Sequence, residues 1–253
     1  MESAGQLAWI HQNGEYLPIS LPCPNSEILP GINWGLAEDI FSPAFWKYQS
    51  RICKERGSHT DYKLGRTLLE EVSVCLLGGY GMPAELGLAA FNRLKRLELL
   101  DGCATAQEIE GALSEPFTLN NKPRKYRFIK QKSRYLSQAL GTLRQSKLPD
   151  DHRECRDYLT TLTGIGPKTA SWVVRNHFGS DDVAILDIHI IRAGITVGFF
   201  EGKADPAKKY FHLEELFLSF CRALEEPASL VDAIMWDYMR RIGPTRKNNT
   251  LAA

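Results

Sequence analysis

The sequence predicts an all-α fold, and three observations support this prediction. From Pro43 onward, apolar residues recur at helical spacing in at least eight segments. Over the same residues, no run alternates apolar and polar residues convincingly, as a half-buried strand would. Two of the predicted helices are joined by a short turn that contains two glycines. The composition, 43% hydrophobic and 24% charged over 253 residues, is that of an ordinary globular protein.

Residues 1–42 differ from the rest of the chain. They contain few periodic apolar positions and many turn-forming residues, as in "LPISLPCPNSEILPGINWG". We therefore expect an irregular or short-strand extension, packed on the body by Trp9 and Trp34. The predicted organisation is an N-terminal extension over 1–42, followed by one helical domain over 43–253.

The helical domain opens with segments 43–56, 62–77 and 83–100, the last with a proline in its first turn. Thr105 and Glu108 have the spacing of a capping box at the start of a fourth helix. A long basic helix over 123–145 would bury a stripe of Tyr126, Ile129, Tyr135 and Leu136. Further helices are predicted over 153–162, 168–178, 212–224 and 229–242, whereas 187–200 fits either a helix or a strand.

Positive charge is concentrated in one segment. Between Glu115 and Asp150 the chain has no acidic residue, and the rest of the chain has 22 basic and 30 acidic residues. A mildly acidic body with one basic segment suits a polyanion-binding surface, although a solvated helix face is the simpler alternative. The nine basic residues are Lys122, Arg124, Lys125, Arg127, Lys130, Lys132, Arg134, Arg144 and Lys147.

The cysteines and the N-terminus bear on location and cofactors. The six cysteines are scattered without metal-ligand spacing, so we expect reduced thiols. The last third of the chain contains one cysteine, Cys221, which excludes a four-cysteine iron–sulfur cluster there. The sequence shows neither a secretory signal nor an apolar run of membrane-spanning length. We expect a cytoplasmic monomer without a membrane partner, associated with the nucleoid if it is bacterial.

The turn "LTGIGPK" lies between two predicted helices. Gly164 and Gly166 permit a tight turn and remove Cβ atoms, so backbone N–H groups could approach a phosphate oxygen closely. The next helix would direct its positive N-terminal end at the same anion. Such a phosphate contact does not distinguish one base from another. The alternative is an ordinary tight connection between helices.

Asp187 lies in the apolar stretch "AILDIHII", nineteen residues after Lys168. Burying an unpaired carboxylate there would be costly, so Asp187 must cap a helix or face a cleft. A structural Lys168–Asp187 ion pair is the simplest alternative to a catalytic pair.

Together these motifs resemble the helix-hairpin-helix (HhH-GPD) DNA glycosylase superfamily. "GIGPKTASWVVRN" and "AILDIHI" are most similar to its 8-oxoguanine DNA glycosylase/AP lyase branch, with supporting matches in "CLLGGYGMPAELGLAAF", "YRFIKQKSRYL" and "AIMWDYMRRIGPTRK". The resemblance covers about residues 60–250, with the helix-hairpin-helix at about 155–178. It implies two helical subdomains with the active-site cleft between them, and double-stranded DNA containing a modified base as the partner.

The resemblance also implies site residues. Lys168 would attack C1′ of the damaged nucleoside and form a Schiff base, and Asp187 would stabilise the cationic sugar. No cofactor is required, but backbone carbonyls of Thr160, Leu162 and Ile165 could hold a structural K⁺ or Na⁺. The residues expected to contact or steer DNA are Gly164, Ile165, Gly166, Thr169, His189, Arg127 and Lys132.

Extrusion of a base requires a side chain to fill the gap in the duplex. The loop "GGYGMPA" lies where relatives have this wedge, so Tyr80 and Met82 are the candidates. Trp172, one helical turn after Lys168, could stack on the extruded base. By the resemblance, Trp236 and Lys247 lie at positions that line the base pocket. Trp172 and His189 could equally be core residues, and the loop an ordinary connection.

Three functions therefore remain open. The first is a bifunctional glycosylase/lyase that acts on 8-oxoguanine. The second is the same chemistry on an oxidised pyrimidine or on a hypermodified base of foreign DNA. The third is a DNA-binding module without enzymatic activity, which would not need the Lys168–Asp187 pair.

Overall fold

A computed structural model describes residues 4–57, 63–79 and 81–243, and within these ranges the chain forms ten helices and six short strands. The predominance of helix confirms the predicted all-α fold class. The chain divides into two compact units, residues 60–185 and residues 1–59 with 186–253. None of the described helices combines the length and apolar character that a membrane span requires. All six cysteines lie in the described residues, and they are thiols rather than members of disulfides.

The N-terminal extension forms two β-hairpins, where we had expected irregular structure or short strands. In the first, β1 (Gln6–Gln12) pairs antiparallel with β2 (Glu15–Leu21) through a two-residue turn, Asn13-Gly14. Both turn residues have positive φ, as in a type I′ turn. The second pairs β3 (Glu27–Leu29) with β4 (Ile32–Asn33).

The packing predicted for the extension is half correct. Trp34 is buried, with 8% of its surface exposed, as we expected. Trp9 is 50% exposed, so its predicted packing on the body is wrong. The strand alternation explains the difference, since Trp9 lies on the outward face of β1 whereas its neighbour Ile10 is buried.

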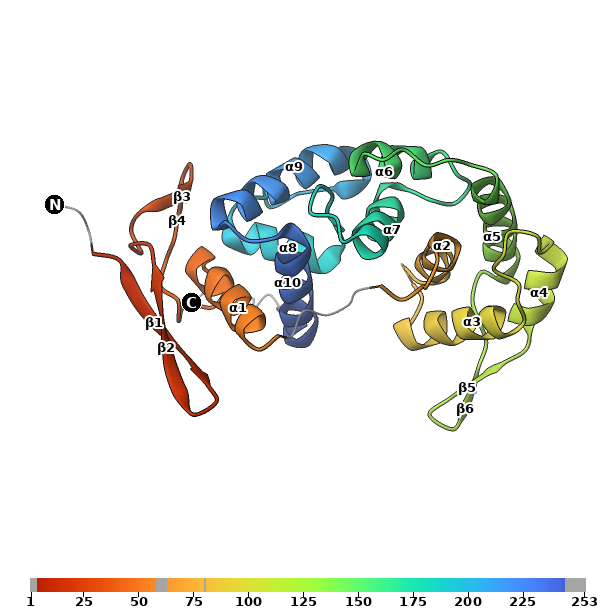
Figure 1. The fold of residues 1–253 in the computed structure, drawn as a ribbon, viewed down its shortest axis with the longest axis horizontal. Helices are drawn as coiled ribbons and strands as arrows, with labels where there is room; N and C mark the ends of the chain where they lie inside the picture. The colour runs from red at the N-terminus through yellow and green to blue at the C-terminus, as the bar shows by residue number, and fades with distance from the viewer. Residues whose placement is uncertain (1–3, 58–62, 80, 244–253) are drawn as a thin grey trace, which may run out of the picture. The chain divides into compact units, whose positions relative to one another are not determined.

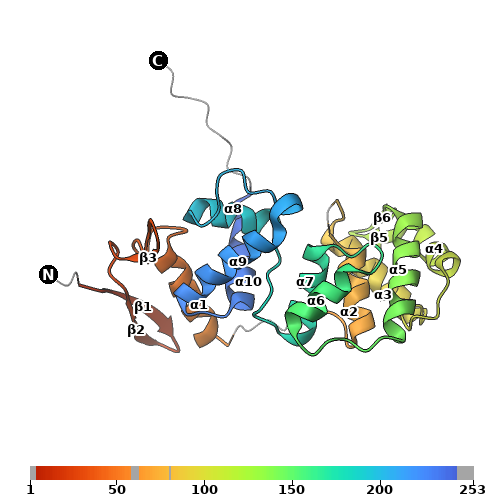
Figure 2. The same ribbon diagram turned by 90° about the horizontal axis from the view of Figure 1, so that it is seen from above.

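The same unit contains α1 (Pro43–Glu55), α8 (Ile188–Val197), α9 (Pro206–Leu224) and α10 (Ala228–Ile242). Helix α10 packs against the other three, and Figures 1 and 2 show it beside α1. The buried carboxylate of Glu226, just before α10, forms ion pairs with Lys47 at 3.3 Å, with Arg51 at 3.3 Å and with Lys54. These pairs fix α1 to the α9–α10 connection.

The other unit contains α2 (Leu68–Leu77), α3 (Ala84–Arg96), α4 (Ala106–Ser114), α5 (Ile129–Arg144), α6 (His152–Thr160) and α7 (Pro167–Phe178). Helix α2 is central, because it packs against α3, α5 and α7 (Figure 2). Its Val72, Leu76 and Leu77 are fully or almost fully buried. The predicted capping box of Thr105 and Glu108 is confirmed at the start of α4.

The predicted helix over 123–145 begins too early. Residues 122–124 form β6 (Lys122–Arg124), which pairs with β5 (Phe117–Leu119) through Asn120 and Asn121. Both asparagines have positive φ, so the Asn-Asn pair makes a hairpin turn that helical periodicity does not reveal. Helix α5 starts at Ile129, and Tyr126 is buried ahead of it rather than within it.

Candidate active site

The glycine turn lies between α6 and α7, as predicted. The Ile165 N–H donates to the Leu162 carbonyl at 3.1 Å, and Gly164 has a φ of +83°. The side chains of Leu162 and Ile165 are buried in the core, whereas Gly164 and Gly166 are exposed. The turn is therefore anchored from inside and presents its glycine backbone to solvent.

The N-terminal end of helix α7 is open and is suited to binding an anion. Gly166 is its N-cap, and Pro167 occupies the first turn. Within the part of the chain that the structure describes, no side chain caps this end, and a Cβ on Gly166 would meet no atom within 4 Å. The first turn contains no acidic residue, so the positive end of the helix is left for an external anion.

Lys168 and Thr169 lie in this first turn and are both half-buried. Trp172, one turn further along, is also half-buried and packs against the end of α2. A Cβ on Gly78 would lie 3.4 Å from Cη2 of Trp172. The lysine and the tryptophan therefore belong to the same helix, as the sequence predicted, and the tryptophan packs this helix against α2.

Asp187 caps helix α8 in the other unit. Its Oδ1 accepts hydrogen bonds from the N–H of His189 at 2.7 Å and of Ile190 at 3.0 Å. The side chain is half-buried. The cap therefore explains how an apolar stretch tolerates this carboxylate, as one of our two alternatives required.

His189 and Trp236 lie side by side near this cap. Their rings meet edge to face with centroids 6.1 Å apart, and the Arg240 guanidinium lies over the Trp236 ring at 4.7 Å. Trp236 is 38% exposed. Nδ1 of His189 is buried and has no hydrogen-bond partner among the described residues. Sequence reasoning missed Arg240, whose position four residues after Trp236 was the available signal.

Lys132 makes a contact within the protein that its predicted DNA-steering role did not include. Its Nζ donates to the Leu76 carbonyl at 2.5 Å, at the C-terminal end of α2. Burial lowers the pKa of Lys132 below its usual value. The ammonium group therefore stabilises the end of α2. Arg127 is exposed, as a steering residue should be, and donates to the Gly81 carbonyl at 3.2 Å.

Of the two predicted wedge residues, Met82 does not project from its loop. Met82 is buried in the core of its unit, because the loop folds back before α3 begins. Tyr80 and Lys247 lie outside the described residues. Among the predicted wedge and base-pocket residues, Trp172 and Trp236 are therefore the two that have half-exposed rings in the described structure.

Phe128 is a further candidate for the wedge, and it was not predicted from the sequence. It is 52% exposed and has a φ of +59°, a left-handed conformation that non-glycine residues seldom adopt. Its ring lies beside the glycine-rich loop, since a Cβ on Gly81 would be 3.9 Å from its Cε2. The signal was a large aromatic residue inside a basic run, which we had assigned to a helix.

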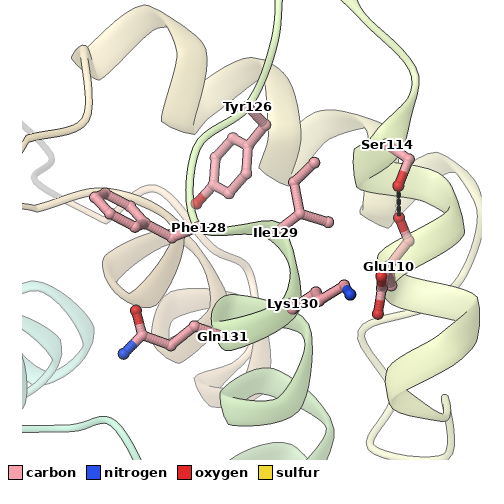
Figure 3. Close-up of a pocket in the computed structure, with 7 residues that line it drawn as sticks. All are labelled: Glu110, Ser114, Tyr126, Phe128, Ile129, Lys130 and Gln131. Carbon is pink, nitrogen blue, oxygen red and sulfur yellow. Dashed lines mark hydrogen bonds between the residues drawn. The ribbon is translucent and has the colours of Figure 1, made fainter.

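An open hollow of about 580 Å³ lies between the end of α4 and the start of α5 (Figure 3). Figure 3 shows Phe128 and Gln131 on one side of Ile129, with Glu110 and Ser114 on the other. Neither Trp172 nor Trp236, the base-pocket candidates that the structure describes, lines this hollow, and Lys168 does not line it either.

A buried polar cluster links α7 to α2. It was not predicted from the sequence. Glu71 accepts hydrogen bonds from the Leu64 and Gly65 N–H groups at 3.0 and 2.7 Å. Its other oxygen accepts from Nδ2 of Asn176, in α7, at 2.8 Å. Glu71 is fully buried, and a glutamate inside an apolar helical segment was the signal.

The chain is similar to known proteins over most of its length. Residues 54–226 match the family described as 8-oxoguanine DNA glycosylase. An 8-oxoguanine DNA glycosylase/AP lyase of Metallosphaera sedula is 34% identical over 159 residues, which is 59% of this chain and 72% of the relative. A relative of the same name from Saccharolobus solfataricus is 32% identical over 177 residues, 66% of this chain and 79% of the relative.

The fold has solved counterparts. The 8-oxoguanine DNA glycosylase of Thermotoga maritima superposes with a TM-score of 0.56 at 23% identity, covering 77% of this chain and 95% of that one. An endonuclease III trapped covalently on DNA gives 0.57 at 20% identity, covering 80% and 90%. At such identities these structures support the fold alone. With the glycine turn, the lysine behind it and the family match over 54–226, this chain belongs to the 8-oxoguanine DNA glycosylase family.

Proposed function

We propose that this chain is a bifunctional DNA glycosylase/AP lyase that removes 8-oxoguanine from double-stranded DNA and then cuts the strand. The observation that supports this most strongly is the open N-terminus of α7. A glycine turn, an uncapped helix end and a lysine in the first turn occur together there, in a chain that belongs to this family. The protein would work as a cytoplasmic monomer, at the nucleoid if it is bacterial.

Lys168 is the proposed nucleophile. Its amine attacks C1′, the C1′–N9 bond breaks, and the base leaves with the electron pair and takes up a proton. The sugar ring then opens as O4′ is protonated, and an imine forms between C1′ and Nζ of Lys168. Loss of a C2′ proton expels the 3′ phosphate by β-elimination. Water finally hydrolyses the imine and frees the lysine.

The glycine turn would bind the phosphate beside the damaged nucleotide. Backbone N–H groups at Gly166 and in the first turn of α7 donate to its oxygens, and the exposed glycines allow the close approach. This contact fixes the distance between the sugar and Lys168. Because α7 is joined to α2 by Glu71 and Asn176, the nucleophile is held on a rigid element.

Asp187 is proposed to stabilise the positive charge that develops on the sugar as the base departs. Its carboxylate is already oriented by two backbone N–H groups, so little reorganisation is needed. His189 would contact a phosphate. Trp236, with Arg240 over its ring, offers a half-exposed face on which an extruded base could stack.

Two further roles belong to the same proposal. Phe128, alone or with Tyr80, would fill the gap left in the duplex, since its exposed ring lies on the glycine-rich loop. Backbone carbonyls of Thr160, Leu162 and Ile165 would hold a monovalent cation near the phosphate. The Leu162 oxygen already accepts one hydrogen bond and has a second lone pair for such an ion.

Base release from a panel of duplexes tests this function. The panel contains 8-oxoguanine, thymine glycol, a glucosylated hydroxymethylcytosine and undamaged guanine, each in the same sequence. We expect release of 8-oxoguanine followed by strand cleavage. Preferential release of either of the two modified pyrimidines would contradict the assigned substrate but retain the chemistry. Binding without release from any duplex would favour the DNA-binding module.

A further inference from the structure

The ring of Tyr135 lies directly against the glycine turn. A Cβ on Gly164 would be 2.1 Å from Cδ2 and 2.4 Å from Cγ of Tyr135, closer than any real contact. Gly164 also has a φ of +83°. Glycine is therefore required at 164 for two separate reasons, the backbone conformation and the space that the ring occupies.

Helix α5 presents this ring from a rigid base. Ser133 and Leu136, on either side of Tyr135, are fully buried. The Tyr135 hydroxyl accepts a hydrogen bond from Nε2 of Gln131, one turn earlier, at 2.9 Å. Contacts within α5 thus contribute to the orientation of the ring. Tyr135 itself is half-buried, so it borders the surface on which the turn is exposed.

A turn of exposed glycines has few side chains of its own to define its conformation. Glycine loses more conformational freedom on folding than any other residue, so such a turn needs external support. Leu162 and Ile165 anchor it on one side. The Tyr135 ring packs on Gly164, between these two anchors in the sequence, and limits the conformations open to the peptide that leads to Gly166.

We propose that Tyr135 is a positioning residue for the phosphate-binding turn. Its ring holds Gly164 in the left-handed conformation and thereby directs the N–H groups at the start of α7 toward the DNA phosphate. This inference rests on the proposed function, in which that phosphate contact brings the sugar to Lys168. The ring face of Tyr135 makes this contribution, whereas its hydroxyl group accepts the hydrogen bond from Gln131.

The test uses the full chain with variants Y135F, Y135L, Y135A, G164A and Y135A/G164A. Affinity for a short 8-oxoguanine duplex is measured over a range of salt concentrations, together with single-turnover base release. Each phosphate contact adds about 0.9 to the slope of log affinity against log salt. We expect Y135F to match the wild type within about twofold, because the ring remains. Y135A should lose about one contact from that slope and about tenfold or more in affinity.

The control is L140A, which removes a fully buried side chain from the same helix away from the turn. It should lower the melting temperature without changing the salt slope. A merely structural role for Tyr135 predicts instead that L140A and Y135A lose slope in proportion to lost stability. If Y135A does not fold, Y135L is used in its place. It keeps an apolar side chain but lacks the ring face, so the losses of salt slope and affinity expected for Y135A are expected for it too.

The double variant provides an independent test of the contact. G164A should weaken binding strongly in the wild-type background and by less in the Y135A background, because the overlap with the ring is gone. Equal effects in both backgrounds, or a wild-type slope in Y135A and Y135L, would overturn the positioning role. Failure of the wild type itself to release 8-oxoguanine would instead count against the proposed function.

Discussion

Asp187 combines two tasks that can be separated at the level of the single residue. It caps α8 through two N–H groups, and it is the proposed stabiliser of the cationic sugar. An asparagine can make the same cap without the charge, since Asn and Asp are similar in preference at N-caps. An alanine can do neither.

We therefore expect D187N to retain the wild-type melting temperature while base release slows about a hundredfold. D187A should lose about 1 kcal/mol of stability in addition, because the cap is lost. Thermal melting and single-turnover release, measured on both variants, check this. Normal release by D187N would move the charge-stabilising role to another residue.

His177, at the end of α7, predicts a pH dependence of stability. Burial, and then the nearby charge of Lys63, lower the pKa of this imidazole below its usual 6.5. The unfolded chain therefore binds the proton more tightly, so stability is lost as pH falls through 6.5 toward the folded-state pKa. H177Q should lose less melting temperature than the wild type between about pH 7.5 and about pH 5.5. Equal losses in H177Q and the wild type would contradict this. H11Q, on the exposed face of β1, is the control.

At the level of elements, the sequence predicts the helices well and the exceptions have a common cause. Helical periodicity, a capping box and a glycine turn are local signals, and the helices that depend on them are present. Their starts are less well predicted, since the helices expected from residues 62 and 212 begin at Leu68 and Pro206. Short strands were expected in the N-terminal extension, but the hairpin turns at Asn13-Gly14 and Asn120-Asn121 were missed, although Asn-Gly is a typical I′ pair. Strands β5 and β6 have three residues each, so periodicity offers little evidence for them. The partners of Lys132 and the burial of Met82 depend on tertiary packing, which no local pattern encodes.

Lys130 and Lys132, both at the start of α5, have the same charge but different surroundings, so charge alone does not predict what each contacts. Lys130 is exposed, whereas Lys132 donates to the end of α2. K132M should destabilise the fold by about 1–3 kcal/mol, because the Leu76 carbonyl loses its partner. K130M should leave stability within about 0.5 kcal/mol. Equal melting temperatures for the two variants would contradict the structural role of Lys132.

For the whole molecule, the family match and the N-terminal extension are separate parts. The match begins at residue 54, so both β-hairpins of the extension precede it. Residues 1–46 contain five acidic residues and no lysine or arginine, which is unfavourable for binding DNA phosphates. DNA binding should therefore depend on the helical part of the chain.

The two tryptophans of the extension test how it is attached. W34A should cost about 3 kcal/mol or more, because a buried indole leaves a cavity. W9S removes a half-exposed ring on the outer face of β1 and should change stability by about 0.5 kcal/mol or less. Chemical denaturation measures both. Base release should be unaffected by W9S, and a slower reaction in that variant would give the hairpin face a role in DNA binding.

Lys168, in the first turn of the helix that follows the glycine turn, is the proposed nucleophile. The most direct measurement is borohydride reduction of the protein with an 8-oxoguanine duplex, followed by mass spectrometry of the proteolysed adduct. We predict a DNA remnant on Lys168, and no adduct with K168Q, whose duplex affinity stays within about threefold of the wild type because phosphate contacts dominate binding. An adduct on another lysine, or a K168Q variant that still forms one, would contradict the account.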